Sequence, residues 1–387
     1  MAGLYLHIPF CERKCLYCDF YSLAPSDDSQ PHELLIPKFV DALCHEAELL
    51  ARDERLRSEY STVFFGGGTP SLLSAAQIGR ILNELAGRFA IRPDVEITVE
   101  ANPGTIDPDK LSRYRDAGVN RLSIGVQSFR DDDLRFLSRI HTAGQAEAAV
   151  RGAREAGFDN ISIDLMFALP TQSLEQWEEN LRRAIEPAPE HISCYSLIVE
   201  PNTPLFRMVQ SGQVRQIDPE LDARMYERTM DVLTGAGYEQ YEVSNFARPG
   251  FRSRHNSQYW DHTPYLGLGP SAHLFWNAER WWNFSNLGVY LDRLLHRQLP
   301  IAAREELTEE QMIAESVFLG LRSDGVDLGS LRSRFGVDLM EEAGTALQEL
   351  FRDRLLLNDG ERLRLTAKGY LVCDQISEVL LGKRHHS

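Results

Sequence analysis

The 387-residue sequence has no hydrophobic run that could cross a membrane. No stretch approaches the roughly 18 consecutive apolar residues that a spanning helix needs. The N-terminal residues 1–11 have neither the basic segment nor the long apolar segment of a secretory signal. We therefore expect a cytoplasmic protein.

Positive charge is also scarce. The chain has 41 Lys and Arg residues against 57 Asp and Glu residues, a formal net charge of −16, which repels nucleic-acid phosphates and anionic lipid. We expect no nucleic-acid partner, and membrane contact only through partner proteins. With 43% hydrophobic and 25% charged residues, the composition is that of a folded globular protein and excludes a disordered or fibrous chain.

Only six cysteines are present, yet three of them, Cys11, Cys15 and Cys18, form a CxxxCxxC motif. Given one cysteine, two more at these spacings arise by chance with a probability of about 0.0002. In a reducing compartment the motif indicates metal ligands rather than disulfides. The other three, Cys44, Cys194 and Cys373, have no ligand neighbour at a suitable spacing, and we expect them in the core.

The number of thiolates in the motif limits the kind of metal site that it can form. Structural zinc needs four ligands, usually in two pairs, and no second pair is present, although His7 could be a fourth ligand. Three thiolates can instead hold three irons of a four-iron, four-sulfur cube. The fourth iron then stays open to a small molecule.

Strand-like and helix-like segments alternate over residues 1–235. Six apolar runs rich in β-formers are each followed by a segment with helical periodicity, which predicts a parallel sheet, closed or partly closed. The expected strands span residues 4–8, 62–65, 95–99, 121–126, 160–167 and 191–199, and the expected helices include 37–55, 74–89, 144–156 and 174–185. The fold class is α/β, a partial (βα)6 TIM-like barrel.

Polar residues and glycines follow these strands, at the end where parallel α/β sheets place their chemistry. They are the cysteine motif, Gly66-Gly67-Gly68-Thr69-Pro70, Glu100-Ala101-Asn102-Pro103, Gln127-Ser128-Phe129 and Asp164. Each alone has an ordinary interpretation as a turn, capping or surface residue. Because such residues end strand after strand, we expect them to line one barrel mouth.

Two further regions complete the chain. Residues 236–304 are aromatic, with four of the five tryptophans, and we expect a loop-rich connecting segment that covers the substrate side. Residues 305–382 predict helices at 308–321, 328–335 and 339–351 and a hairpin at 355–365, the outline of a winged-helix-like domain. Its 8 basic and 16 acidic residues disfavour DNA binding. We assign no role to His385 and His386.

The cysteine motif, with Tyr17 as its aromatic residue, resembles the CxxxCx(aromatic)C signature of the radical S-adenosylmethionine (SAM) superfamily. The resemblance implies that Cys11, Cys15 and Cys18 bind a four-iron, four-sulfur cluster and that SAM chelates the open iron through its amino and carboxylate groups. It also implies that an electron from the cluster cleaves SAM to a 5′-deoxyadenosyl radical. The expected partial barrel agrees with this superfamily.

Further motifs resemble the oxygen-independent coproporphyrinogen III oxidase family over nearly the whole chain. They are residues 5–11 (YLHIPFC), 66–70 (GGGTP), 100–103 (EANP), 125–128 (GVQS) and 163–166 (IDLM). The resemblance implies that SAM contacts Tyr5, Tyr17, Gly67, Gly68, Thr69, Glu100, Gln127, Arg139 and Asp164. One departure is Ser138 in the first position of the family's Gly-Arg-x-His motif, of which Arg139 and His141 are kept.

Three features resemble the haem chaperone branch of that family, HemW, rather than its oxidases. Phe20 stands where the oxidases have a fourth cysteine, and their long N-terminal extension is missing. Residues 255–260 form an HNxxYW motif in which His255 can ligate haem iron, while Tyr259, Trp260, Trp276 and Trp281 offer flat apolar faces. The ordinary interpretation of His255 is a satisfied histidine in an aromatic segment.

This branch implies a chaperone that binds the cluster, SAM and haem and passes haem to respiratory haem proteins, with a homodimer as one oligomeric state. We expect no coproporphyrinogen oxidase activity. The alternative is an oxidase that uses the 5′-deoxyadenosyl radical for oxidative decarboxylation of propionate side chains.

Overall fold

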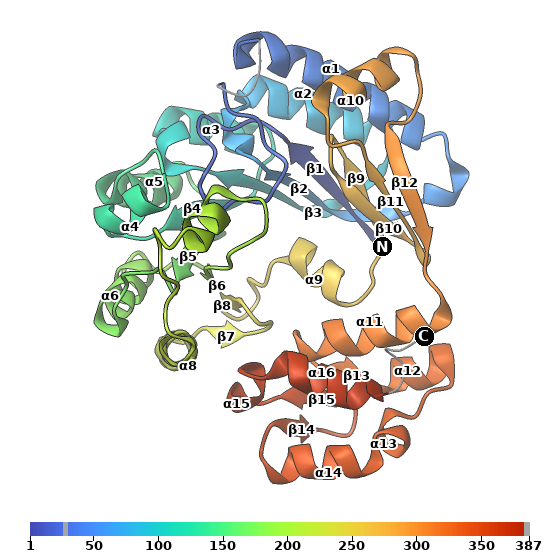
Figure 1. The fold of residues 1–387 in the computed structure, drawn as a ribbon. Helices are drawn as coiled ribbons and strands as arrows, with labels where there is room; N and C mark the ends of the chain where they lie inside the picture. The colour runs from blue at the N-terminus through green and yellow to red at the C-terminus, as the bar shows by residue number, and fades with distance from the viewer. Residues whose placement is uncertain (26–29, 383–387) are drawn as a thin grey trace.

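The computed structural model describes residues 1–25 and 30–382; His385 and His386 lie outside the described residues. Six parallel strands stand side by side in chain order, which confirms the predicted partial (βα)6 barrel of the α/β class (Figure 1). They are β1 (Ala2–Ile8), β2 (Glu59–Gly67), β3 (Ala90–Ala101), β4 (Arg121–Gln127), β5 (Ile161–Phe167) and β6 (His191–Ser196).

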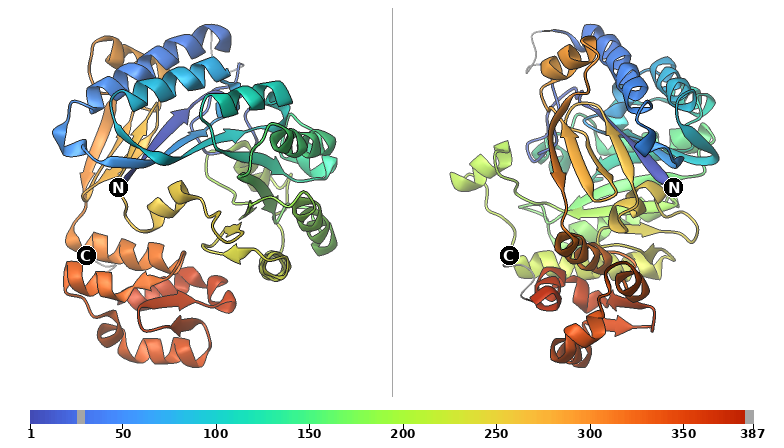
Figure 2. Two further views of the ribbon diagram at one scale, coloured as in Figure 1. Left: turned by 180° about the vertical axis from the view of Figure 1, so that it is seen from behind. Right: turned by 90° about the vertical axis from the view of Figure 1, so that its right-hand side faces the viewer.

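Helices cover the convex face of this sheet, as the two views in Figure 2 make clear. They are α1 (His32–Leu50), α2 (Ala75–Ala86), α3 (Pro108–Asp116), α4 (Asp131–Phe136), α5 (Ala143–Glu155), α6 (Leu174–Ile185) and α8 (Pro219–Gly235). Helix α7 (Pro204–Gln210) instead projects away from the sheet beside the loop after β1 (Figure 2), where Leu205 N–H donates to the Leu16 carbonyl at 2.9 Å. The connections also hold the short 3-10 turns η1 (Glu54–Leu56), η2 (Pro70–Leu72) and η3 (Pro103–Thr105). Ser74 and Ser173 are N-caps, as expected, and each completes a capping box.

Helix α1 begins before its predicted start at Pro37. Pro37 lies inside the helix, where its missing N–H removes one backbone hydrogen bond. Leu35 and Ile36, which precede it, are buried in the main core. The burial of Leu35 and Ile36 stabilises the helical turn before Pro37 and offsets the missing hydrogen bond.

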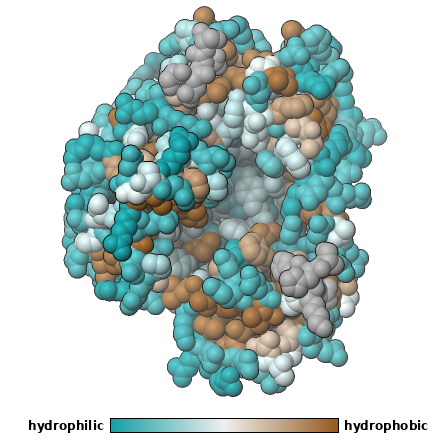
Figure 3. All heavy atoms as spheres, viewed as in Figure 1, coloured by the Kyte–Doolittle hydropathy of each residue, from teal (hydrophilic) through white to brown (hydrophobic). Residues whose placement is uncertain are grey.

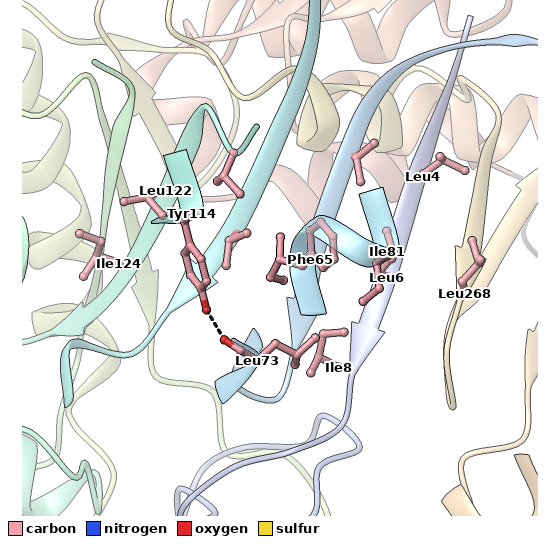
Figure 4. Packing of buried hydrophobic residues seen from close by; sticks show 14 of the residues in the cluster. Leu4, Leu6, Ile8, Phe65, Leu73, Ile81, Tyr114, Leu122, Ile124 and Leu268 are labelled. Atoms are coloured by element: carbon pink, nitrogen blue, oxygen red, sulfur yellow. Dashed lines mark hydrogen bonds between the residues drawn. The ribbon is translucent and has the colours of Figure 1, made fainter. Parts of the chain in front are cut away.

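The strands alternate between a packed outer face and a polar inner face. Leu4, Leu6 and Ile8 of β1 point toward the helices and are fully buried among residues such as Phe65, Ile81 and Leu268 (Figure 4). Each such side chain stabilises the fold by roughly 1.5–3 kcal/mol. Tyr114 of α3 fixes the loop after β2, because its hydroxyl donates to the Leu73 carbonyl at 2.6 Å.

The prediction that residues 236–304 are loop-rich is wrong. The segment holds β7 (Glu239–Gln240), β8 (Asn245–Ala247), α9 (Arg254–Trp260), β9 (Tyr265–Leu268), β10 (His273–Trp276), β11 (Glu279–Asn283), α10 (Leu287–Leu295) and β12 (Ile301–Glu306). Its strands extend both edges of the barrel into a 12-stranded sheet, with β9 beside β1 and β8 beside β6. Trp276 and Trp281 belong to the main hydrophobic core, so they offer no free face to a porphyrin.

Helix α9 differs from the others because it lies on the concave side of the sheet (Figure 1). Beneath it sits the C-terminal domain, and the face seen in Figure 3 is hollowed between the barrel and this domain.

The C-terminal domain has a hydrophobic core of its own, and it combines helices with a small antiparallel sheet in the order β13-β15-β14, as a winged-helix-like domain requires. Its elements are α11 (Glu309–Leu321), β13 (Val326–Asp327), α12 (Leu328–Phe335), α13 (Leu339–Glu342), α14 (Gly344–Arg352), β14 (Leu356–Asn358), β15 (Arg362–Leu365), α15 (Ala367–Tyr370) and α16 (Cys373–Leu381). The single helix expected at 339–351 is two, separated at Ala343. None of the described helices combines the length and apolar character that a bilayer crossing demands.

Candidate functional site

A cavity of about 400 Å³ opens where the parallel strands end. Of the residues that the sequence analysis assigned to the cluster, to SAM or to haem iron, all but two line it, namely Cys11, Cys15, Tyr17, Cys18, Gly67, Gly68, Thr69, Glu100, Gln127, Arg139 and Asp164. The exceptions are Tyr5 and His255. We call this the cofactor cavity.

The three clustered cysteines lie on one loop that follows β1. The loop is closed at its base, since Cys11 N–H donates to the Leu23 carbonyl at 2.9 Å and Leu23 N–H donates to the Pro9 carbonyl at 2.6 Å. Within it, Cys18 N–H donates to the Cys15 carbonyl at 3.2 Å, which forms a tight turn. All three cysteines are free thiols on one wall of the cavity.

Burial raises the pKa of the Cys11 thiol and raises that of Cys18 to about 11. One donor offsets this cost at Cys11, and a second donor contacts Cys15. The Thr69 hydroxyl donates to Cys11 Sγ at 3.4 Å, and Arg139 Nη1 donates to Cys15 Sγ at 3.6 Å. These contacts favour negative charge on the sulfurs.

Among the described residues, no three His, Cys, Asp or Glu side chains converge on the position of a single metal ion. A cube binds each thiolate at a different iron, so its ligands need not converge on one point. His7 is not a fourth ligand. Its Nδ1 receives the Tyr5 hydroxyl at 3.1 Å and its Nε2 lies 2.8 Å from the Tyr21 carbonyl oxygen, so both ring nitrogens are engaged.

The glycine turn after β2 owes its composition to a close approach of two chains. A Cβ on Gly68 would lie 2.7 Å from the Phe10 carbonyl oxygen, and Gly67, at φ 105°, faces the ring of His7. Gly68 N–H donates to the Ile8 carbonyl at 2.8 Å. The glycines therefore hold the cysteine loop against the end of β2.

Two half-buried carboxyl groups, Glu100 of β3 and Asp164 of β5, face the cavity. Burial, and next to it the charge of Asp164, raises the pKa of Glu100 to about 8, while its Oε2 accepts from Gly67 N–H at 3.2 Å. Burial also raises the pKa of Asp164. The Ser123 hydroxyl lies 3.1 Å from each oxygen of Asp164 and fixes its orientation.

Gln127 and Arg139 form the wall beside Cys15. Gln127 ends β4 with φ 64°, a left-handed conformation that a register shift in the β4–β5 pairing accompanies. Arg139 Nη2 donates to the Gly125 carbonyl at 2.7 Å, and its buried Nε has no hydrogen-bond partner in the described part of the chain. The guanidinium thus carries an unused donor.

Tyr5 lies one layer deeper than the cavity wall. A Cβ on Gly66 would meet its ring at 3.0 Å, and the ring stacks near Phe64, with centroids 6.3 Å apart. Tyr5 therefore supports the glycine turn from below.

His255 is also remote from the cavity, with 1% of its surface exposed. Its Nδ1 lies 2.7 Å from the Thr62 hydroxyl and its Nε2 lies 2.8 Å from the Tyr259 hydroxyl. Burial lowers the pKa of His255 to about 3, so the ring is neutral. Ligation of haem iron by His255 would require breaking one of these bonds and withdrawing α9 from the sheet, and the structure disfavours that role.

Comparisons with known proteins agree with this geometry. The family model of the radical SAM superfamily matches residues 5–184, and that of the HemN C-terminal domain matches residues 307–372. The haem chaperone HemW of Bacillus subtilis is 36% identical over 99% of this chain and 100% of its own length. The chain belongs to the HemW family of the radical SAM superfamily.

Two other relatives extend the comparison. The mouse mitochondrial radical S-adenosyl methionine domain-containing protein 1 is 34% identical over 98% of this chain and 87% of its own. The solved structure of coproporphyrinogen III oxidase (HemN) from Escherichia coli superimposes with a TM-score of 0.83, at 27% identity, over 98% of this chain and 89% of that one.

Membership of the radical SAM superfamily implies a four-iron, four-sulfur cluster and SAM as cofactors. The cofactor cavity fits them, because it offers three free thiols on one wall and two half-buried carboxyls on another, in a volume typical of small-molecule sites.

The sequence analysis missed three serines that lie behind the wall of the cofactor cavity and two residues that belong to the wall. Ser123, Ser162 and Ser193 surround Asp164 inside the barrel. The signal was available, since each serine interrupts an apolar strand in the two-residue alternation that marks its inner face. Met166 and Tyr195 line the cavity as well. Phe20 lies at its rim with 66% of its surface exposed.

Proposed function

We propose that this protein is a haem chaperone that binds a four-iron, four-sulfur cluster, SAM and haem, and delivers haem to respiratory haem proteins. The observation that supports it most is full-length similarity to HemW chaperones combined with a single cavity that gathers the cysteine motif and the strand-end residues.

In this proposal Cys11, Cys15 and Cys18 hold the cluster, which supplies one-electron chemistry when bound. Arg139 and Thr69 stabilise negative charge on the sulfurs through their contacts with Cys15 and Cys11.

The remaining strand-end residues hold SAM. Glu100 and Asp164 face its positively charged groups, and ionisation of either carboxyl is favoured once a positive charge arrives in this buried place. Arg139 Nε, which lacks a partner, is suited to an anionic group of the cofactor. Tyr17 and Gln127 complete the wall, and Tyr5 acts from the layer below.

We place the protein in the cytoplasm, where the three thiols stay reduced and free to bind iron. We propose that it contacts the membrane only through its haem-accepting partner proteins. A homodimer is the oligomeric state we would test first.

The second candidate function is that of an oxygen-independent coproporphyrinogen III oxidase. The close superposition on HemN favours it. Phe20, at the cavity rim where those oxidases have cysteine, counts against it.

One preparation tests both. The full chain is reconstituted anaerobically with iron and sulfide, then assayed in parallel for haem binding by Soret absorbance and for decarboxylation of coproporphyrinogen III with SAM and a reductant. We expect haem binding and no decarboxylation. Turnover to protoporphyrinogen without haem binding would contradict the chaperone function and support the oxidase function.

A further inference from the structure

Helix α9 has two faces with different surroundings. His255 and Gln258 are buried against the strands, where the Gln258 amide donates to Ser61 Oγ at 3.0 Å. Ser257 and Trp260 face the opposite way and line a cavity of about 320 Å³ between α9 and the C-terminal domain. Within the HNxxYW motif, His255 and Gln258 therefore anchor the helix to the sheet, and Ser257 and Trp260 form the face that lines the cavity.

A second cavity, of about 620 Å³, adjoins the first. Both are lined by Asp261, His262 and Arg334, so they lie next to each other, and we call the two cavities together the crevice. The second cavity adds Phe335, which is partly exposed, and Phe275, which has 4% of its surface exposed and packs in a small hydrophobic cluster with Phe335. Together the crevice has aromatic walls from the barrel and from the C-terminal domain.

Some charged groups of the crevice are paired within the protein, whereas the carboxylates of Asp261 and Glu309, which also line it, have no ion pair with a described residue. Arg362 lies 3.7 Å from Asp327, and Asp324 accepts from Arg252 at 2.7 Å. Arg334 is different, because no carboxylate of the described residues lies within ion-pair distance of it and its guanidinium stacks 5.0 Å from the ring of Phe335. It is a free cation at the exposed end of α12, beside an aromatic face.

We propose that haem binds in this crevice, with its ring against Trp260 and Phe335 and a propionate paired with Arg334. The assignment rests on the proposed haem chaperone function and names its site. A flat apolar ring with carboxylates on one edge matches aromatic walls that end in an unpaired arginine at the surface. The volume suits a ligand of this size.

The C-terminal domain thus supplies part of the haem site. The surroundings of His255 also favour this site, because both ring nitrogens are hydrogen-bonded within the protein and the buried face of α9 leaves no space for a porphyrin. In this arrangement His255 is a positioning residue that fixes α9, and Trp260 contacts haem.

The test compares Arg334→Gln with Arg332→Gln in the reconstituted full chain. Arg332 is a matched control, because it is exposed on the same helix but is paired with Asp338 at 2.6 Å and lines neither cavity. Haem affinity is measured by Soret titration, first with haem and then with its dimethyl ester, which has no propionate charge. We expect Arg334→Gln to weaken haem binding about tenfold and to leave ester binding unchanged. Arg332→Gln should match the wild type with both ligands.

The outcomes separate the site from the function. If the wild type binds no haem, the chaperone function fails and this site fails with it. If the wild type binds haem and Arg334→Gln binds haem and ester as the wild type does, haem lies elsewhere and only this inference is overturned. Trp260→Ala gives a second measurement, with weaker binding of both ligands expected and equal binding contradicting the inference. Circular dichroism and cluster absorbance establish that each variant is folded.

Discussion

The hydroxyl of Thr62 and Nδ1 of His255 lie 2.7 Å apart, although 193 positions separate the two residues. This bond ties α9 to β2 inside the barrel. Glu96 of β3 adds to it, because its carboxylate accepts from the backbone N–H of Arg254 at 3.1 Å and of His255 at 3.0 Å. The ring of His255 also stacks on Phe64, with centroids 5.0 Å apart.

From these contacts we predict that His255→Ala destabilises the protein. The change removes a buried ring, leaves the Tyr259 hydroxyl without its His255 partner and leaves the Thr62 hydroxyl with Gln258 alone, at a cost of roughly 2–4 kcal/mol. The melting temperature of His255→Ala should be lower than that of the wild type. Tyr259→Phe loses one hydroxyl only, so its melting temperature should fall less.

The Soret spectrum distinguishes this role from iron ligation. If His255 ligates haem iron, the band position of bound haem should change in His255→Ala. We expect an unchanged band position in the variant, with fewer molecules competent to bind. A shifted band in a variant that melts like the wild type would contradict the anchoring role.

A second prediction concerns the cysteine loop. Changing Cys11, Cys15 and Cys18 together to Ala should abolish the visible absorbance of the cluster, because no other cysteine lines the cavity. Cys44→Ala is the control, since Cys44 belongs to the hydrophobic core and should not affect iron or sulfide content. Unchanged iron and sulfide in the triple variant would place the cluster on other residues.

A third prediction separates SAM binding from cluster assembly. Glu100→Gln and Asp164→Asn each remove a carboxyl that can ionise beside a bound positive charge and leave the cysteines in place, so SAM affinity should fall while cluster absorbance stays unchanged. Ser123→Ala, which removes a hydroxyl donor from Asp164, should have a smaller effect in the same direction. Isothermal titration with the anaerobic cluster-bound protein measures all three. If both carboxyl variants bind SAM with wild-type affinity, Glu100 and Asp164 do not belong to the SAM site.

The positions of the cofactor residues could be predicted because they follow a rule of topology. Parallel strands end at one edge of the sheet, so Glu100, Gln127 and Asp164 had to meet near the cysteine loop once the βα units were recognised. Periodicity and strand order decide this without knowledge of long-range packing.

The placement of residues 236–304 could not be predicted in the same way. Strands β9 and β8 join opposite edges of the sheet, and the pairing of β9 with β1 joins residues that are far apart in the chain. The position of α9 inside the barrel depends on Glu96 and Thr62, which look like ordinary strand residues in the sequence. His255 therefore attracted attention as a ligand, whereas its burial makes it an anchor.

The last prediction concerns Glu242, a buried carboxyl between β7 and β8. Only 1% of its surface is exposed, its Oε1 has no hydrogen-bond partner in the described structure, and burial raises its pKa from 4.5 to about 7. Below pH 4.5 the folded and unfolded chains both hold the proton, so the group has no effect on stability. Between pH 4.5 and about 7 the unfolded chain has lost the proton that the folded chain keeps, and stability falls as the pH rises.

Above about pH 7 this loss is complete, at about 3 kcal/mol. Glu242→Gln cannot ionise and keeps an oxygen for the hydrogen bonds that Ser244 and Asn245 donate. Its melting temperature should therefore be close to that of the wild type at pH 5 and higher than that of the wild type at pH 8. Glu239→Gln, an exposed position two residues earlier, should show no such divergence. A constant difference between Glu242→Gln and the wild type across this range would mean that Glu242 is ionised in the folded protein at pH 5.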